Sequence, residues 1–290
     1  MSAPGRPKGE YPSAQHDGTP LSAVLRGLGL AAVAAWCLAP FLWQALTSFK
    51  PPAELLSVPP LLPSRLTLEH YAAIFDDGAF AHLMANSAIV AACTTLLALG
   101  AGAAAAFALS VLRVRHRSLI LAVAVAISMF PPIATVSPLF LALSGLGLRD
   151  TLLALVVTYT TFCLPLAIWL LANFFDTLPR ELYVAARVDG CTAFGALRRV
   201  VLPLSAPGLL ATGLLVFVFA WNEFMFALAF TATDAARTVP VGIALFPGLH
   251  EIPYGEIAAA SVVVTLPVVA LAFAFQRRLV EGLTAGAVKG

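Results

Sequence analysis

Long apolar stretches separated by polar segments make up most of the chain after residue 26. Six of them are long enough to cross a bilayer, which takes about 20 mostly apolar residues in a helix. They cover 27–46, 87–111, 118–143, 152–174, 206–230 and 257–275. This pattern predicts an all-α, polytopic membrane protein with six transmembrane helices in one domain, 21–281. The polar segment 1–20, rich in Pro and Gly, predicts a disordered N-terminal tail rather than a signal peptide, and 282–290 forms a C-terminal tail.

The composition agrees with a membrane protein and excludes several other classes. Of the 290 residues 60% are hydrophobic and 11% are charged, and the mean hydropathy is +0.91, so a soluble enzyme is nearly ruled out. A net charge of +2 is too small to indicate a nucleic-acid partner. The four cysteines lack the spacing of metal ligands or of a disulfide framework, which indicates that they serve as small apolar side chains in the packing.

The distribution of basic residues predicts the orientation of the chain. Thirteen of the 17 Lys and Arg residues fall on one side: Arg6, Lys8, Arg26, Arg113, Arg115, Arg117, Arg180, Arg187, Arg198, Arg199, Arg277, Arg278 and Lys289. The other side has Lys50, Arg65, Arg149 and Arg237. By the positive-inside rule, both termini and the loop 176–203 face the cytoplasm of a bacterial or archaeal cell, with the chain in its cytoplasmic membrane.

Glu223 is the one acidic residue within a predicted span, in the sequence Trp221-Asn222-Glu223-Phe224. It must find water, a hydrogen-bond partner or a proton there. It is either a residue of a transport pathway or gate, or a carboxylate solvated near the outer mouth of the fifth span. Because a proton relay needs several titratable groups and no histidine lies deep in a span, an ion-driven mechanism has little to work with.

Two consecutive prolines interrupt the third span at Phe130-Pro131-Pro132. They remove helical hydrogen-bond donors, so the helix must kink or open. Such a break either lines a cavity or is a packing kink. Hydroxyl, amide and aromatic side chains can bind a solute without using charge, and the candidates for a substrate path are Phe130, Thr161, Trp221, Asn222 and Glu223.

The loop 176–203 predicts two short helices joined by a tight turn. Thr177 is expected to cap the first helix and Thr192 the second. Asp189-Gly190 supplies the turn because glycine adopts positive φ readily. Pro203 is expected to end the second helix. Such a compact element suits either docking of another protein or packing on the underside of the bundle.

This loop resembles the cytoplasmic signature of the integral membrane subunits of ATP-binding-cassette importers: Glu-Ala-Ala, three residues, Gly, nine residues, an aliphatic, any residue, Leu and Pro. Ala185, Ala186, Gly190, Leu202 and Pro203 match at the right spacing. The signature glutamate is replaced by Val184, and Glu181 on the same helix is the candidate carboxylate. The resemblance implies the type I importer fold, with ATPase coupling through Glu181, Ala185, Ala186, Asp189, Gly190, Leu202 and Pro203.

Further segments are similar to maltose-type carbohydrate permeases, closest to their trehalose and maltose branch. These segments are 48–54 with 68–71, then 221–224, and 282–290. The resemblance implies a homologous second permease, two ATPase subunits and an extracytoplasmic sugar-binding protein as partners. It also implies that the tail contacts the ATPases through Gly286, Lys289 and Gly290.

The chain itself lacks the Gly-Lys-Ser/Thr sequence of a P-loop, since its three lysines follow Pro7, Phe49 and Val288. We therefore expect no catalysis and no cofactor in this chain, with ATP and Mg²⁺ bound by the partner ATPase. Three alternatives remain: the same fold importing another solute such as glycerol phosphate or a polyol, an ion-coupled secondary transporter, and a structural or assembly protein. An anionic solute would favour a basic side chain within the spans, where this sequence has none.

Overall fold

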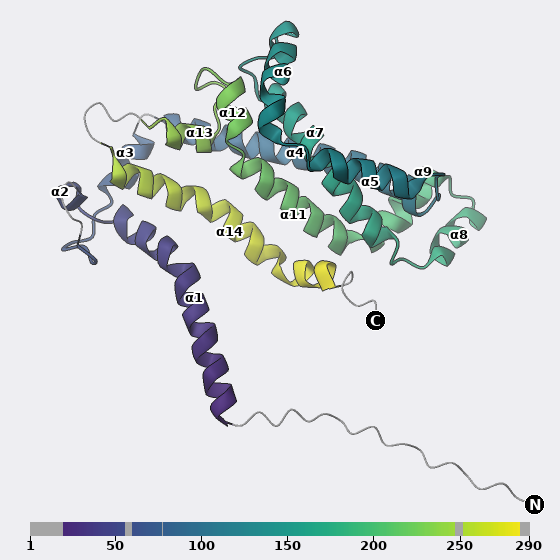
Figure 1. The fold of residues 1–290 in the computed structure, drawn as a ribbon, viewed down its shortest axis with the longest axis horizontal. Helices are drawn as coiled ribbons and strands as arrows, with labels where there is room; N and C mark the ends of the chain where they lie inside the picture. The colour runs from purple at the N-terminus through teal and green to yellow at the C-terminus, as the bar shows by residue number, and fades with distance from the viewer. Residues whose placement is uncertain (1–19, 56–59, 77, 247–251, 285–290) are drawn as a thin grey trace, which may run out of the picture.

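The computed structural model describes residues 20–55, 60–76, 78–246 and 252–284, with side chains from 24 to 276. All regular secondary structure in these ranges is helical (Figure 1). The elements are α1 (Pro20–Ser48), α2 (Pro52–Leu55), α3 (Glu69–Phe75), α4 (Ala79–Ser110), α5 (Arg117–Ser128), α6 (Pro132–Gly145), α7 (Leu152–Phe175), α8 (Arg180–Val188), α9 (Ala193–Ala196), the π-helical turn η1 (Leu197–Val201), α10 (Leu202–Leu204), α11 (Ala206–Asn222), α12 (Met225–Phe230), α13 (Val239–Ala244) and α14 (Tyr254–Thr284).

Single helices form four of the predicted spans. Within the described residues, α1, α4, α7 and α14 are each long and apolar enough to cross a membrane. Two bent pairs complete the set: α5 with α6 at 87°, and the helical segment Ala193–Leu204 with α11 at 82°. Counting each pair as one span gives the six predicted, and the all-helical class is confirmed. The two tails lie outside the described ranges, apart from Pro20 and the end of α14.

The prolines break the third span completely. α5 ends at Ser128 and α6 begins at Pro132, with Pro131 in an extended conformation between them. Pro132 occupies the first turn of α6, where its missing N–H costs nothing. The predicted kink is therefore a sharp bend that turns α6 away from the bundle axis, as Figure 1 shows.

The fifth span departs from the prediction in two places. The expected continuous helix 206–230 is wrong, because α11 stops at Asn222 and a separate α12 starts at Met225. Pro203 does not end the preceding helix either: it lies inside α10, and the bend follows at Ser205. A proline in a first turn is tolerated, so Pro203 fits a newly started helix.

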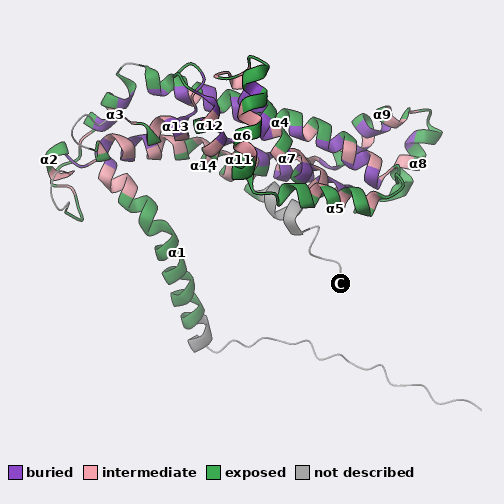
Figure 2. Cartoon of the chain, turned by 45° about the horizontal axis from the view of Figure 1, so that its top comes forward, coloured by how far each residue is buried: buried purple, intermediate pink, exposed green. Residues whose placement is uncertain are grey.

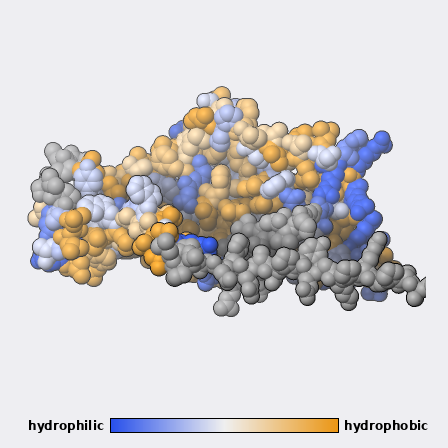
Figure 3. Space-filling model, turned by 60° about the horizontal axis from the view of Figure 1, so that its bottom comes forward, coloured by the Kyte–Doolittle hydropathy of each residue, from blue (hydrophilic) through white to orange (hydrophobic). Residues whose placement is uncertain are grey.

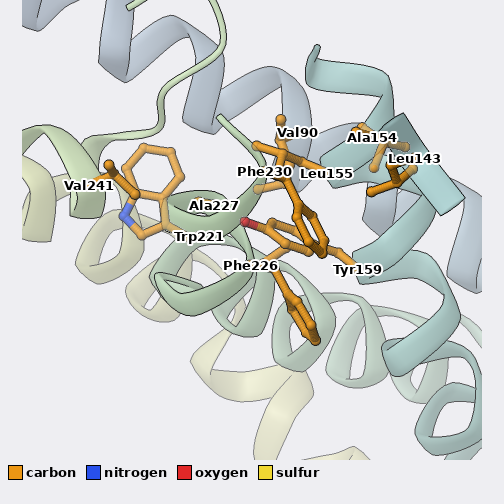
Figure 4. Close-up of a cluster of buried hydrophobic side chains, with 13 residues drawn as sticks. Val90, Leu143, Ala154, Leu155, Tyr159, Trp221, Phe226, Ala227, Phe230 and Val241 are labelled. Atoms are coloured by element: carbon orange, nitrogen blue, oxygen red, sulfur yellow. The ribbon is translucent and has the colours of Figure 1, made fainter. Parts of the chain in front are cut away.

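Helices α4 and α7 form the centre of the bundle. Small residues in the run 100–106 let the two helices approach closely, because a Cβ added to Gly102 would lie 3.2 Å from the Cβ of Ala167. Ala103 and Ala106 of the same run are buried. Figure 4 shows one apolar cluster, where Tyr159 of α7 lies among Phe226 and Phe230 of α12.

Helix α1 stands apart from the bundle. Its side chains from Val24 to Leu42 are exposed, including Trp36 at 84% (Figure 2). It meets α14 only toward its C-terminal end, where Ser48 and Lys50 are buried. An apolar helix so exposed requires lipid or another protein around it. The apolar surface in Figure 3 extends across the middle of the molecule, and hydrophilic atoms gather at the right, where Figure 1 places α8 and α9.

Candidate functional site

We call the two ends of the bundle the α8 end and the α13 end. The α8 end holds α8, α9 and the last turns of α4 and α7. The α13 end holds α3, α13, the first turns of α4, α7 and α14, and the segment 230–238 before α13. The signature residues belong to the α8 end, and Glu223 belongs to the interior.

Helix α8 has an inner and an outer face. Tyr183 packs edge-on against Phe107 of α4, with ring centroids 5.8 Å apart, and Ala186 is buried beside it. The opposite face presents Val184, Ala185 and Val188, the last 81% exposed. Glu181 lies one turn before Val184 and is also exposed. Helical spacing therefore gives α8 an exposed apolar stripe, Val184, Ala185 and Val188, with a carboxylate at its start.

The small size of the two signature alanines serves different purposes. Ala186 is buried against the protein's own core, so it fixes α8 on the bundle rather than leaving space for another protein. Ala185 is exposed and leaves the stripe accessible. Of the two signature alanines, only Ala185 is therefore accessible to another protein, because Ala186 points inward.

The turn after α8 forms as predicted. Gly190 has φ +84° and its N–H donates to the carbonyl of Arg187 at 3.2 Å. A Cβ at Gly190 would meet nothing within 4 Å, so the backbone conformation alone requires glycine. The Arg187 guanidinium donates to the carbonyl of Cys191 at 2.9 Å, which braces the turn. Asp189, the C-cap of α8, is exposed beside it.

One of the two predicted helix caps is present. The Thr192 hydroxyl accepts from the N–H of Gly195 at 3.0 Å, as predicted. The Thr177 cap is wrong, since Pro179 is the N-cap of α8 and the Thr177 hydroxyl donates back to Phe174 at the end of α7. Pro179 therefore leads the chain into α8, and no side chain caps the start of this helix. Leu202 is half-buried and Pro203 exposed, both just before the bend at Ser205.

A basic turn completes the α8 end. Arg117 at the start of α5 forms an ion pair with Asp176 at the end of α7. Arg113 and Arg180 line a small cavity of about 80 Å³ between the end of α4 and the start of α8.

Gly208 of α11 lies against the ring of Phe174, so close that any side chain there would collide with it. These contacts place the ends of α4, α5, α7 and α11 around α8.

The break in the third span opens a groove. Phe130 and Thr161 both line it, together with other residues of α5, α6 and α7, and its volume is about 640 Å³. The lining is mostly apolar, and the Thr161 hydroxyl donates to the carbonyl of Val157 in its own helix. Two of the predicted path residues thus lie in one groove, which the sequence could not show.

Glu223 forms the other break by capping α12. Its two carboxylate oxygens accept from the backbone N–H groups of Phe226 at 2.9 Å and Ala227 at 3.1 Å. A carboxylate at a helix N-terminus is stabilised both by these bonds and by the helix dipole. The hydrogen-bond partner that the sequence required is therefore the backbone. The ring of Phe226 in turn lies 4.8 Å from that of Phe162, a neighbour of Thr161 that lines the groove.

The two residues before Glu223 differ in exposure. Trp221 is 3% exposed, stacks on Phe217, and its indole N–H donates to the carbonyl of Val264 on α14 at 3.3 Å. It belongs to the core in this conformation. Asn222 is exposed and donates to the carbonyl of Val218.

The α13 end is cross-linked by side chains that the sequence did not single out. Asp150, with φ +60°, accepts from the N–H groups of Ala232 and Thr233 at 2.7 and 3.0 Å and from the Thr233 hydroxyl. These backbone hydrogen bonds hold the pKa of the Asp150 carboxyl below its usual value. No local sequence pattern indicates this contact, because its partners are more than 80 positions away.

Helix α4 holds the same loop from the other side. The Asn86 amide donates to three backbone carbonyls, those of Asp234, Ala235 and Arg237, at 2.9 to 3.3 Å. The Ser87 hydroxyl accepts from the N–H of Val239 at 2.8 Å. The loop before α13 is thereby fixed both to α4 and to the loop before α7. Within the described part of the chain, no group of three or more His, Cys, Asp or Glu could hold a metal ion.

Comparisons with known proteins agree with this architecture. The model of the family "binding-protein-dependent transport system inner membrane component" matches residues 71–284. The trehalose/maltose transport system permease protein MalG of Thermococcus litoralis is 44% identical over 93% of this chain and 98% of its own. The trehalose transport system permease protein SugB of Mycobacterium tuberculosis is 43% identical over 89% and 94%.

A solved structure shares the fold. It is that of a bacterial ABC transporter involved in the import of the acidic polysaccharide alginate, with a TM-score of 0.76 and 22% identity over 89% of this chain and 96% of that one. The type I importer permease fold expected from the signature is therefore confirmed. The family match covers α4 to α14 with both bent pairs and the α8 loop. The chain belongs to the family of binding-protein-dependent transport system inner membrane components.

Proposed function

We propose that this chain is the membrane-spanning permease subunit of an ATP-driven importer of trehalose, maltose or a related oligosaccharide. The observation that carries the proposal is the α8 stripe, an exposed apolar surface held by a fixed turn at the polar end of the bundle. It is combined with identity above 40% to two trehalose or trehalose/maltose permeases over nearly the whole chain.

The α8 end faces the cytoplasm in this proposal, as the positive-inside rule requires, with both termini on that side. Two ATPase subunits bind ATP and Mg²⁺ and hydrolyse the nucleotide. One of them covers the α8 stripe, where Glu181, Ala185, Asp189 and Gly190 form the contact. Leu202 and Pro203, before the bend at Ser205, pass its movement on to α11. The tail residues Gly286, Lys289 and Gly290 contact the same ATPases.

The sugar passes between this subunit and a homologous second permease, after delivery by an extracytoplasmic binding protein. The groove with Phe130 and Thr161 supports this route because it opens on the surface of the bundle at a broken span. Phe130 offers a ring for stacking, and Asn222 and Thr161 offer polar groups. The capping carboxylate of Glu223 positions α12 beside this route, and Trp221 supports Glu223 from the core. The exposed α1 contacts lipid and the second permease.

The test is the ATPase activity of the complex, co-expressed with its neighbouring subunits and reconstituted in vesicles. We expect binding protein loaded with trehalose or maltose to stimulate hydrolysis, and the same sugar to accumulate inside. Empty binding protein and binding protein loaded with a polyol are the controls. An assembled complex that responds to the polyol but to neither disaccharide would overturn the substrate, and one that takes up sugar without ATP would overturn the mechanism.

A further inference from the structure

A buried histidine joins two distant segments at the α13 end. His70 of α3 is 2% exposed and lies between the segment after α1 and the first turn of α14. Its Nε2 is 2.9 Å from the carbonyl oxygen of Lys50, and its Nδ1 is 3.0 Å from Oε1 of Glu256. These contacts span 20 and 186 positions of sequence, so the imidazole bonds two chain segments that are distant from each other in the sequence.

The chemistry of the two partners of His70 determines how many protons these contacts require. A carbonyl oxygen can only accept, so Nε2 of His70 must carry a hydrogen and donate it to Lys50. An ionised carboxylate also can only accept, so a neutral ring with its proton on Nε2 would direct a lone pair at Glu256. The observed contact therefore requires one more proton between Nδ1 and Oε1, carried either by an imidazolium or by a protonated Glu256.

The surroundings are shaped for this contact. Any side chain at Gly255 would collide with the His70 ring, so the glycine next to Glu256 is needed for the ring to reach the carboxylate. The next residue of α3, Tyr71, makes a 2.8 Å hydroxyl contact with Ser48 at the end of α1, and its ring lies 5.3 Å from that of Phe49. Helix α3 thus ties the end of α1 to the start of α14 with consecutive side chains.

Other ionisable groups around the ring have their own partners or face solvent. The Lys50 ammonium lies over the ring of Trp43, 4.1 Å from its centroid. Glu54 of α2 binds Ser64, and Glu69 of α3 pairs with Arg65. On the flanking helices His82 of α4 and Tyr254 of α14 are exposed. Among the described residues, Glu256 is the charged side chain that contacts His70.

We propose that His70 and Glu256 are positioning residues that hold the end of α1 to the start of α14 through one shared proton, which makes this end of the importer sensitive to pH. When the pH rises and the proton is lost, a lone pair faces a carboxylate at 3.0 Å and the contact separates. A hollow of about 550 Å³ beside the pair, lined by Pro52, Leu55 and Ile252 among others, gives water and the freed carboxylate room. The effect on transport rests on the proposed function, in which α1 and α14 are two of the spans of the permease.

Glu256→Gln provides a sharp test. A glutamine amide donates a hydrogen to neutral Nδ1, so it keeps the contact without the extra proton. We expect the thermal midpoint of the wild-type complex to fall by several degrees, and its sugar uptake to fall several-fold, between about pH 6 and about pH 9. In Glu256→Gln both should stay flat. In Glu256→Ala both should be low at every pH, because the contact is absent.

The control is Glu69→Gln, which removes the carboxylate of the residue next to His70 on α3. This variant should follow the wild-type pH profile. A Glu256→Gln variant that loses stability or uptake with rising pH as the wild type does would overturn the proposal. The thermal midpoint needs no substrate. If the complex transports neither disaccharide, the proposed function fails while the midpoint still tests the shared proton.

Discussion

The two ends of the bundle are held in different ways. At the α13 end, the side chains of Asn86, Asp150, His70 and Ser87 bond to backbone or carboxyl groups far away in the sequence. At the α8 end, most ties of the α8 loop are local: the Gly190 turn, the Thr192 cap and the Arg187 contact lie within five positions of their partners. Its longer-range anchors are the apolar packing of Tyr183 and Ala186, the pair Arg117–Asp176, and one buried hydrogen bond from the Ser110 hydroxyl to the carbonyl of Ala172.

This difference separates the α13 end, which must stay fixed, from the α8 end, which must present a surface to a partner. A buried hydrogen bond is costly to break without replacement, so cross-links of this kind keep loops in one arrangement. Helix α8 is short, packs on the bundle through apolar contacts and leaves its outer face exposed. It can therefore transmit the movement of a partner without breaking such bonds. In the proposed function, the α13 end keeps the helices aligned and the α8 end couples them to the ATPase.

The largest effect is expected at the turn of the α8 end. Gly190→Ala would force a side chain into positive φ, at a cost of about 1–2 kcal/mol. If that strain displaces α8, the coupled fraction falls about five- to thirty-fold. We expect stimulated ATPase activity and uptake to fall by that factor while the complex still assembles. Gly190→Asn is the matched control, since Asn adopts this conformation more readily. Full uptake in Gly190→Ala would show that the turn does not transmit movement.

A second prediction concerns the close approach behind α8. Gly208→Ala would place a methyl group into the ring of Phe174 and lower the free energy of unfolding by about 1–3 kcal/mol. The thermal midpoint of the purified complex measures this. Gly100→Ala, where an added Cβ meets nothing within 4 Å, should leave the midpoint unchanged or raise it. Equal midpoints for the two variants would argue against a tight contact at the α8 end.

The smallest effect is expected at the α13 end. The pKa of Asp150 is lowered in the folded protein, so its contribution to stability is present above the usual carboxyl pKa and is lost as the pH falls through the lowered value. Asp150→Asn tolerates the same positive φ but removes the charge. The thermal midpoint of this variant should be lower at neutral pH and should decline less on acidification. Asp76→Asn, which removes an exposed aspartate at the end of α3, should retain the wild-type acid slope.

Local chemistry explains which features could be predicted from the sequence. The first, second, fourth and sixth spans, the break at Phe130-Pro131, the Gly190 turn and the Thr192 cap depend on neighbouring residues, and the structure confirms them. The separation of α11 from α12 was missed because Glu223 caps α12 through an N–H only three residues ahead, within a largely apolar run. The Asp150, Asn86 and His70 contacts were missed because each depends on residues brought together by the fold.

The α8 stripe provides the most direct test of the account. Val188→Asp places a charge on the most exposed residue of the stripe without altering the buried face of α8. The matched control is Val114→Asp, at an exposed valine of the turn between α4 and α5 at the same end. The measurement is the amount of ATPase subunit that co-purifies with each variant. We predict loss of the ATPase from Val188→Asp and retention by Val114→Asp. Full retention by Val188→Asp, with normal stimulation by loaded binding protein, would contradict the assignment of α8 as the coupling surface.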